Sequence, residues 1–356
     1  MIEHLAPLSL QEDYDNAGLS IGDPDDEVSG CLICLDVTEE VIREATQKKI
    51  RLIISHHPVI FGKIMRLTGQ TLTERLVLGA IREGIALYSV HTNLDNVDNG
   101  VSHALCLKLG LKNIQVLRKG KGLLRKLVTF CPKDHAHKVR EALFAAGAGH
   151  IGNYDQCSFN AEGIGTFRGN EASNPFVGEK GKLHFENESR IETIFPYYNE
   201  KQVIQALMDT HPYEEVAYDI YRLENDFGNV GMGMTGELEK EMQEEDFLRL
   251  IKTALNIPCI RHSRLRGKTV RKVAVCGGSG SFLIPDAISS HADFFVTADL
   301  KYHQFQLAGD DMVIADVGHF ESEQFTCQLI ADHLKKNFAK FAVQISETPV
   351  NPVNYF

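Results

Sequence analysis

The sequence predicts an α/β protein in which two similar α/β halves with mostly parallel sheets form one core, interrupted by an inserted ferredoxin-like α+β domain. In the first and last thirds of the chain, short apolar runs alternate with helical stretches, an order that implies βαβ units. The middle of the chain instead follows a βαβ-βαβ order between glycine-rich edges. We therefore expect a core formed by residues 1–119 and 232–356, and an inserted domain at residues 120–231.

The two outer thirds share the same predicted rhythm of strand, helix, strand, helix, strand and helix. In the first third, apolar runs predict strands and helical spacing predicts helices. The strands are residues 31–35, 51–54 and 86–90, and the helices are residues 38–47, 72–83 and 101–109. In the last third, the strands are residues 272–276, 294–297 and 312–316, and the helices are residues 282–289, 302–307 and 321–336.

The middle segment is predicted by the same signals to contain strands at residues 127–131, 182–192 and 216–221, with helices at residues 135–146 and 199–208. Glycines at both edges of this segment favour turns. We interpret it as an insertion that folds by itself.

Composition and charge exclude several classes of protein. The net charge of −11 works against non-specific binding to nucleic acid or to anionic membranes. No apolar run approaches the roughly 18–20 residues that cross a bilayer, so we expect a cytoplasmic protein with no membrane partner. Cys31 and Cys34 form a CxxC pattern on a predicted strand, where residues three apart point to opposite faces. Core packing of reduced thiols is therefore favoured over zinc or redox chemistry.

Metal-type ligands follow three predicted strands. His56 and His57 come after the strand at residues 51–54, and His91 and Asp95 follow residues 86–90. His319 and Glu323 follow residues 312–316. The carboxyl ends of strands in an open α/β sheet meet at one crevice, so these side chains predict one metal site assembled from both ends of the chain.

The spacing of these ligands bears on how they bind. Adjacent histidines on an extended segment point in opposite directions, but a turn after the strand would let His56 and His57 each reach one of two neighbouring ions. His319 and Glu323 are four residues apart at the start of a predicted helix and share one face. A carboxylate there can bridge two ions. Imidazole and carboxylate ligands suit Zn, Fe or Mn in place of a structural thiolate zinc.

Other residues are candidates for substrate binding and proton transfer. Gly277, Gly278, Ser279 and Gly280 follow a strand and precede a helix, so their N–H groups could face a phosphate, although a plain tight turn is an equal alternative. His91 is a candidate to support a metal ligand by a hydrogen bond or to act as an acid or base. His303, just past another strand end, is the second acid/base candidate. Asp15 and Asp36 are further candidates to line the crevice.

Four motifs resemble a known family. Residues 15–19 (DNAGL), 55–58 (SHHP), 91–95 (HTNLD) and 318–323 (GHFESE) are similar to those of the NIF-three-like family, whose members are often labelled homologues of type 2 GTP cyclohydrolase I. The resemblance covers both outer thirds. Residues 211–218 (HPYEEVAY) resemble the CutA/PII-like module of the longer bacterial members.

The resemblance implies a dinuclear metal centre with two divalent ions, Glu323 bridging them, and a ring-shaped homohexamer whose sites face an internal cavity. The implied ligands are His56, His57, Asp95, His319 and Glu323. It also implies a longer first helix than the one that begins at Met1-Ile2-Glu3 here.

The leading functional hypothesis is a metal-dependent hydrolase that uses activated water on a nucleotide-like small molecule. If that molecule is GTP, water attacks C8 of guanine and formate leaves, His91 or His303 moves protons, and the glycine segment holds the triphosphate. Two alternatives remain open. One is a metal-binding regulatory or scaffold protein with a PII-like ligand-sensing module, and the other is a two-metal phosphoesterase.

Overall fold

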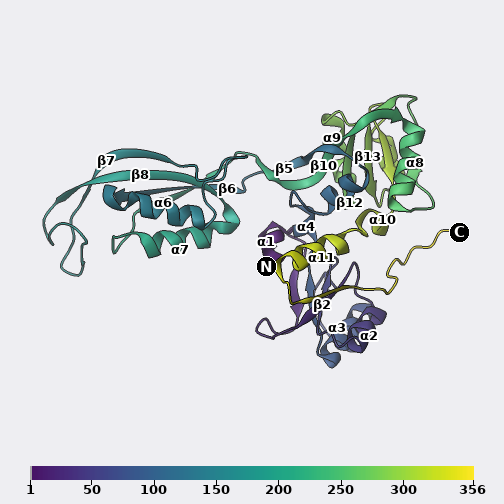
Figure 1. The fold of residues 1–356 in the computed structure, drawn as a ribbon, viewed down its shortest axis with the longest axis horizontal. Coiled ribbons are helices and arrows are strands. Elements are labelled where there is room, and N and C mark those ends of the chain that lie inside the picture. The colour runs from purple at the N-terminus through teal and green to yellow at the C-terminus, as the bar shows by residue number, and fades with distance from the viewer. Residues whose placement is uncertain (1) are drawn as a thin grey trace. The chain divides into compact units, whose positions relative to one another are not determined.

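The protein is a mixed α/β structure with three sheets, described here by a computed structural model for residues 2–356 (Figure 1). The chain divides into two compact units. The core unit combines Met1–Lys119 with Asn229–Phe356, and the inserted unit is Gly120–Gly228. Met1, named in the expectation about the first helix, lies outside the described residues, and the first described helix is the short α1 (Ile2–Leu5).

The first sheet of the core unit has the strand order β1-β4-β3-β2-β15. Its strands are β1 (Gly18–Ile21), β2 (Gly30–Cys34), β3 (Leu52–Ser55), β4 (Ala86–Ser89) and β15 (Ala342–Ile345). Neighbours from β4 to β15 run parallel, and only β1 is antiparallel to its neighbour among these described strands. Apolar side chains on one face pack against α2 (Glu39–Gln47) and α3 (Leu72–Glu83), so this face holds a buried core.

Capping residues explain where these two helices begin and end. The Thr38 side chain accepts a hydrogen bond from the Val41 amide at the start of α2, and Thr71 does the same for Glu74 at the start of α3. Helix α3 ends at Gly84, whose φ of 62° is the left-handed conformation that favours glycine. Both helices therefore have ends that the sequence encodes locally.

The second sheet of the core unit has the order β11-β14-β13-β12-β10-β5. Its strands are β5 (Lys112–Gly120), β10 (Phe227–Gln243), β11 (Arg261–His262), β12 (Thr269–Ser279), β13 (Phe294–Ala298) and β14 (Val313–Asp316). The pairs β12–β13 and β13–β14 are parallel, whereas β10 pairs antiparallel to β12 and β11 pairs antiparallel to β14. Hydrophobic clusters cover both faces, one with α5 (Val101–Lys108) and α8 (Glu244–Leu255), the other with α9 (Ile284–Ser289).

The two halves of the core differ from the expectation in three ways. The C-terminal β15 belongs to the first sheet and β5 to the second, so the halves exchange strands. The first sheet is mostly parallel, as predicted, but the second is mixed. The helix predicted at residues 321–336 is broken into α10 (His319–Glu323) and α11 (Thr326–Asn337), and at the break the Gln324 side chain donates to the carbonyls of Leu255 and Glu321.

The inserted unit contains β6 (Leu124–Pro132), α6 (Ala136–Ala145), β7 (Phe159–Phe167), β8 (His184–Pro196), α7 (Glu200–Thr210) and β9 (Tyr218–Leu223). This order is typical of a ferredoxin-like unit. The sheet order is β7-β8-β6-β9, with antiparallel neighbours. Helices α6 and α7 lie side by side on one face, over a buried apolar cluster (Figure 1).

Among residues 2–356, no helix combines the length and apolar character needed to span a membrane.

Candidate metal centre

His56 and His57 are presented together because the chain turns where β3 ends. The His56 amide donates to the Cys34 carbonyl and the His57 amide to the Leu35 carbonyl, which keeps both residues beside the end of β2. Their rings lie 4.9 Å apart between centroids, tilted by 47°. Both side chains therefore reach one cluster, which an extended segment would not allow.

Asp95 and His91 come from the segment after β4. The short helix α4 (Thr92–Asp95) has His91 as its N-terminal cap position and carries Asp95 one turn further on. The His91 ring lies 5.3 Å from the ring of His56 and 5.4 Å from that of His57. The strand end at β4 thus delivers one imidazole and one carboxylate to the histidine pair.

His319 and Glu323 are brought to the same place by α10, which begins directly after β14 and Gly318. Gly318 has a φ of 92°, and a Cβ there would collide with the Glu321 carboxylate, so glycine is required at this turn. One helical turn then sets His319 and Glu323 on one face, with Glu323 buried.

The Nδ1 atoms of all four histidines are held by oxygen acceptors. His56 Nδ1 donates to the Val90 carbonyl over 2.7 Å. The other three Nδ1 atoms donate to carboxylates of Asp36, Asp15 and Asp299, for His57, His91 and His319 respectively, over 2.8, 2.8 and 2.7 Å. A proton fixed on Nδ1 leaves the lone pair of each Nε2 available, which is the arrangement of metal-ligating histidines.

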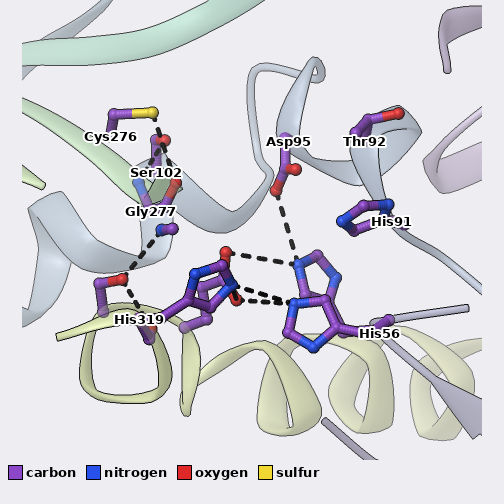
Figure 2. Close-up of polar contacts among 12 residues, drawn as sticks. His56, His91, Thr92, Asp95, Ser102, Cys276, Gly277 and His319 are labelled. Atoms are coloured by element: carbon purple, nitrogen blue, oxygen red, sulfur yellow. Dashed lines mark hydrogen bonds and ion pairs between the residues drawn. The ribbon is translucent and has the colours of Figure 1, made fainter. Parts of the chain in front are cut away.

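The Nε2 atoms of His56, His57 and His319 lie beside the Glu323 carboxylate. Figure 2 shows the side chains of His56, Asp95 and His319 pointing toward one another. Glu323 Oε2 lies 3.1 Å from Nε2 of both His57 and His319. Glu323 Oε1 and Asp95 Oδ1 each lie 3.8 Å from His56 Nε2. Three groups have the spacing to hold a metal ion: His56-His57-His91, His57-His319-Glu323 and His56-Asp95-Glu323.

Two buried atoms show that the residues fit a cation. His56 Nε2 and Asp95 Oδ1 are both buried and make no hydrogen bond among residues 2–356. Buried polar atoms are nearly always paired, so each such atom calls for a partner. A divalent ion accepts electron pairs from imidazole and carboxylate alike and would satisfy both atoms.

The pKa shifts indicate which groups of the centre would carry protons when no metal ion is bound. Burial opposes the charge on His57, but hydrogen bonds to Asp36 and Glu323 outweigh it and raise the pKa to about 10. In the same way, Glu323 and Asp299 raise the pKa of His319 to about 9 against the effect of burial. Burial favours a neutral Glu323, yet the surrounding histidines hold its pKa well below the usual value. Protons therefore stabilise the metal-free centre and compete with a metal.

Asp95 shows the opposite shift. Burial, reinforced by the nearby Glu323 carboxylate, raises the pKa of Asp95 to about 7, although His56 opposes this. Two carboxylates crowded into one buried site disfavour double ionisation. A cation between them would relieve that repulsion, which agrees with the unpaired Asp95 oxygen.

A cavity of about 550 Å³ opens next to the centre. Its wall includes Asp95, Glu323 and three of the histidines, with apolar residues further out. Tyr14, Phe61 and Phe282 also line it, with 70%, 56% and 47% of their surface exposed. Among the described residues of this wall there is no lysine or arginine.

The glycine segment, for which anion binding and a plain tight turn were equal expectations, packs against the centre. Strand β12 continues through Ser279, and the amides of Gly277 and Gly278 already donate to the hydroxyls of Ser102 and Ser322. A Cβ on Gly278 would collide with the Glu323 carboxylate. These glycines therefore make room for the central carboxylate. Gly277 and Ser279 line the cavity, whereas Gly278 and Gly280 are not part of its wall.

His303 is placed away from the cluster. It lies on the 3-10 helix η5 (Tyr302–Gln306), is exposed, and stacks edge-on against Tyr302. It does not line the cavity. His91, in contrast, lines the cavity beside the centre and belongs to one of the three metal-spaced groups.

One residue of the centre was missed by the sequence analysis. Asp299, which holds His319, sits directly after β13 with a φ of 55°. The sequence predicts the strand end at residues 294–297, and the candidate named after it is His303, four residues beyond Asp299. The usable signal was the carboxylate nearest the strand end.

Comparisons of sequence and fold with known proteins identify the family of this chain. The family model described as Duf34/NIF3 (NGG1p interacting factor 3) matches residues 1–352. The chain belongs to the Duf34/NIF3 family.

Similar proteins of this family span the whole chain. A GTP cyclohydrolase 1 type 2 homolog of Halalkalibacterium halodurans is 40% identical over 338 residues, covering 94% of this chain and 91% of that protein. A protein of the same name from Bacillus subtilis is 38% identical and covers 100% of this chain and 96% of its own. The crystal structure of a Bacillus cereus protein related to NIF3 superposes with a TM-score of 0.88 at 37% identity, covering 99% and 96%. The Duf34/NIF3 architecture therefore extends through both units of this chain.

Proposed function

We propose that this Duf34/NIF3 member is a hydrolase with a dinuclear metal centre that acts on a nucleotide-like small molecule. The observation that carries the proposal is the position of Glu323, whose two carboxylate oxygens face different histidines. Oε2 faces His57 and His319, and Oε1 faces His56 next to Asp95. Together with Asp95, these residues would hold two divalent ions, and the ligand chemistry suits Zn, Fe or Mn.

Two divalent ions at such a site supply an activated water and polarise the bond under attack. The protein's own contribution to proton transfer centres on His91. Asp15 accepts a hydrogen bond from His91 Nδ1 and also from the amide and hydroxyl of Thr92. Burial opposes ionisation of Asp15, but these bonds outweigh it and lower its pKa, so Asp15 stays charged and fixes the tautomer of His91. His91 Nε2 is then free to accept a proton beside the centre.

The cavity wall bears on the substrate. Phe61 packs edge-on against His91, with 5.6 Å between ring centroids, and offers an exposed aromatic surface close to the proposed proton acceptor. A planar heteroaromatic ring would stack against such a surface. A triphosphate would find no lysine or arginine among the described wall residues, so its charge would fall on the metal ions alone. We therefore infer that the ring, more than the phosphates, is what the wall recognises.

The names of the relatives point to GTP as the first substrate to test. We would measure formate release from GTP and from guanosine, using protein reconstituted separately with Zn, Mn and Fe(II). The Glu323→Ala variant serves as the control. Turnover that disappears in this variant supports hydrolysis at the proposed centre. Absence of turnover with two ions bound per chain would reject guanine compounds as substrates.

The resemblance to the family also leads us to propose a homohexamer in solution. Light scattering on the full chain, at protein concentrations above and below about 1 µM, tests this directly. A monomer or dimer across that range would contradict it.

A further inference from the structure

The inserted unit has a cavity of its own, on the sheet face opposite α6 and α7. It measures about 700 Å³, within the range of small-molecule sites. Its floor is formed by Phe130 of β6 and by Glu188 and Arg190 of β8. Ile191 of β8 packs into the apolar cluster beneath the helices. Because side chains alternate between the two faces of a strand, Glu188 and Arg190 lie on the opposite face of the sheet. The segments around residues 168–176 and 213–217 form its walls.

A buried carboxylate lies at the bottom of this cavity. Glu188 is only 8% exposed and lines the cavity. Its Oε1 accepts a hydrogen bond of 2.7 Å from the Tyr213 hydroxyl. Among residues 2–356, no basic group lies within ion-pair distance of Glu188, and Oε2 accepts no hydrogen bond. A buried carboxylate that lacks a cationic partner is costly, so this position favours a bound cation.

The surroundings of Glu188 are built to keep this carboxylate in place. The His211 ring donates from Nε2 to the Phe130 carbonyl, and its Nδ1 accepts from the Tyr213 amide. This fixes the loop that aims Tyr213 at Glu188. On the neighbouring strand, a Cβ at Gly165 would collide with the Glu188 carboxylate, so glycine at this position makes room for it. The motif at residues 211–218 thus has a structural task inside the inserted unit.

Aromatic rings form the rest of the wall. Tyr213 lies 6.0 Å from Phe167 and 6.4 Å from Phe176, measured between ring centroids. Phe130 adds a fourth ring. Aromatic faces attract organic cations, and the attraction grows when the cation is desolvated. A carboxylate among such rings is the chemistry that recognises an alkylammonium group.

The charged side chains around the cavity also favour a cationic ligand. Four carboxylates line it, from Glu162, Glu188, Glu214 and Glu215, against two guanidinium groups from Arg168 and Arg190. Arg190 is already paired with Glu192 over 3.0 Å, and Glu162 with Lys133 over 2.6 Å. The cationic side chain nearest in sequence to Glu188 is therefore committed elsewhere.

We propose that the inserted unit binds a small organic cation, with its ammonium group against Glu188 and its apolar part among Phe167, Phe176 and Tyr213. This site is separate from the metal centre and does not depend on the proposed hydrolase activity. It gives the inserted unit a ligand-binding function of its own.

Choline and its uncharged isostere 3,3-dimethylbutan-1-ol are the probes that test the proposal. Their affinities for the full chain are measured by titration calorimetry and by ligand-observed NMR. We expect choline to bind at least tenfold more tightly than the neutral isostere. We also expect Glu188→Gln to abolish that preference, because the amide keeps the shape of the side chain and removes its charge.

Two further variants complete the test. Glu186→Gln is the matched control, because Glu186 is on the same strand, is paired with His184 over 2.9 Å and does not line the cavity. It should bind choline like the wild type. Phe176→Ala removes a half-exposed ring and should weaken choline binding even if Glu188→Gln fails to fold. Equal affinity for the two probes, undiminished choline binding by Glu188→Gln, or no binding of choline at millimolar concentration would each overturn the proposal.

Discussion

The Nε2 atoms of His57 and His319 face each other across 3.2 Å, although the two residues are 262 positions apart in the chain. Each ring holds its Nδ1 proton toward a carboxylate, so both facing nitrogens are electron-pair donors. Two such lone pairs beside the Glu323 carboxylate require a positive charge between them. Where no ion is bound, a proton would supply it, in agreement with the raised pKa values of both histidines, and a metal ion would replace that proton.

The first prediction concerns Glu323. Replacing it by alanine removes the carboxylate that faces three histidines, so at least one metal ion should be lost from the reconstituted protein. Elemental analysis after gel filtration measures the metal content per chain, and circular dichroism checks the fold. Glu321→Gln is the matched control, since Glu321 lies two residues away, is buried, and contacts Asn351 and Tyr355. Full metal retention in Glu323→Ala would remove the bridging role.

A second prediction concerns Asp299, which orients His319. The Asp299→Asn variant keeps the shape of the side chain but weakens its hold on the His319 Nδ1 proton. Metal affinity should fall by about 10- to 100-fold, as is usual when such an outer partner is lost. Chelator competition measures it. The exposed Asp310, changed to asparagine in the same way, should leave affinity unchanged, and equal affinities in both variants would show that Asp299 does not position the ligand.

The metal-type ligands could be predicted from the sequence, whereas the turn that brings two of them together could not. His56, His57, Asp95, His319 and Glu323 could be grouped from sequence because each follows an apolar run that only a buried strand explains. The turn that brings His56 and His57 together depends on backbone bonds to Cys34 and Leu35, and these form only once β2 and β3 pair. The residues around His56 and His57 alone do not predict that pairing.

Strands β10 and β15 could not be predicted from the sequence for a related reason, since partners distant in the chain define them. Strand β10 contains four glycines in its first ten residues, which favour a loop when considered alone, yet it lies between β5 and β12 and pairs with β12 from Met234 onward. Strand β15 is short and lies far from β2 in sequence, so its membership in the first sheet could not be inferred from periodicity. For the glycine segment after residue 276, anion binding and a plain tight turn were equal alternatives, and the sequence could not decide because the neighbours in space, Ser102, Ser322 and Glu323, are distant in the chain.

A third prediction concerns pH. Burial opposes ionisation of Glu44, but hydrogen bonds from Lys48, Ser346 and Thr348 outweigh it and lower the pKa from 4.5 to about 2. Because the folded pKa is depressed, the stabilisation is complete above about pH 4.5 and is lost as the pH falls toward 2. Glu44 ties α2 to the segment after β15, so these contacts join the two ends of the chain.

Glu44→Gln should therefore melt at a lower temperature than the wild type at pH 7, and the difference should shrink steadily between pH 4.5 and pH 2. Thermal unfolding followed by circular dichroism across this range measures it. Glu83→Gln, at an exposed position at the end of α3, provides the comparison and should track the wild type at every pH. A difference in Tm that stays constant down to pH 2 would show that the charge of Glu44 contributes nothing.

The fourth prediction is that the core unit folds and binds metal without the inserted unit. Strands β5 and β10, which lead into and out of residues 120–228, are neighbours in the second sheet. A short glycine-serine linker between Lys119 and Asn229 can therefore close the chain at small entropic cost. The core keeps its own contacts at this junction, since the Gly231 amide donates to the Asn96 carbonyl and the Asp98 amide to that of Asn229.

The metal ligands, their carboxylate partners and the hydrophobic clusters on both sheets lie within the core unit. The shortened protein should accordingly be monodisperse by light scattering, show a cooperative thermal transition, and bind as many metal ions per chain as the full-length protein. It should also lose choline binding completely, because the cavity around Glu188 is removed with the deleted residues. An insoluble product, or a folded one without metal, would mean that the core requires the inserted unit for its structure.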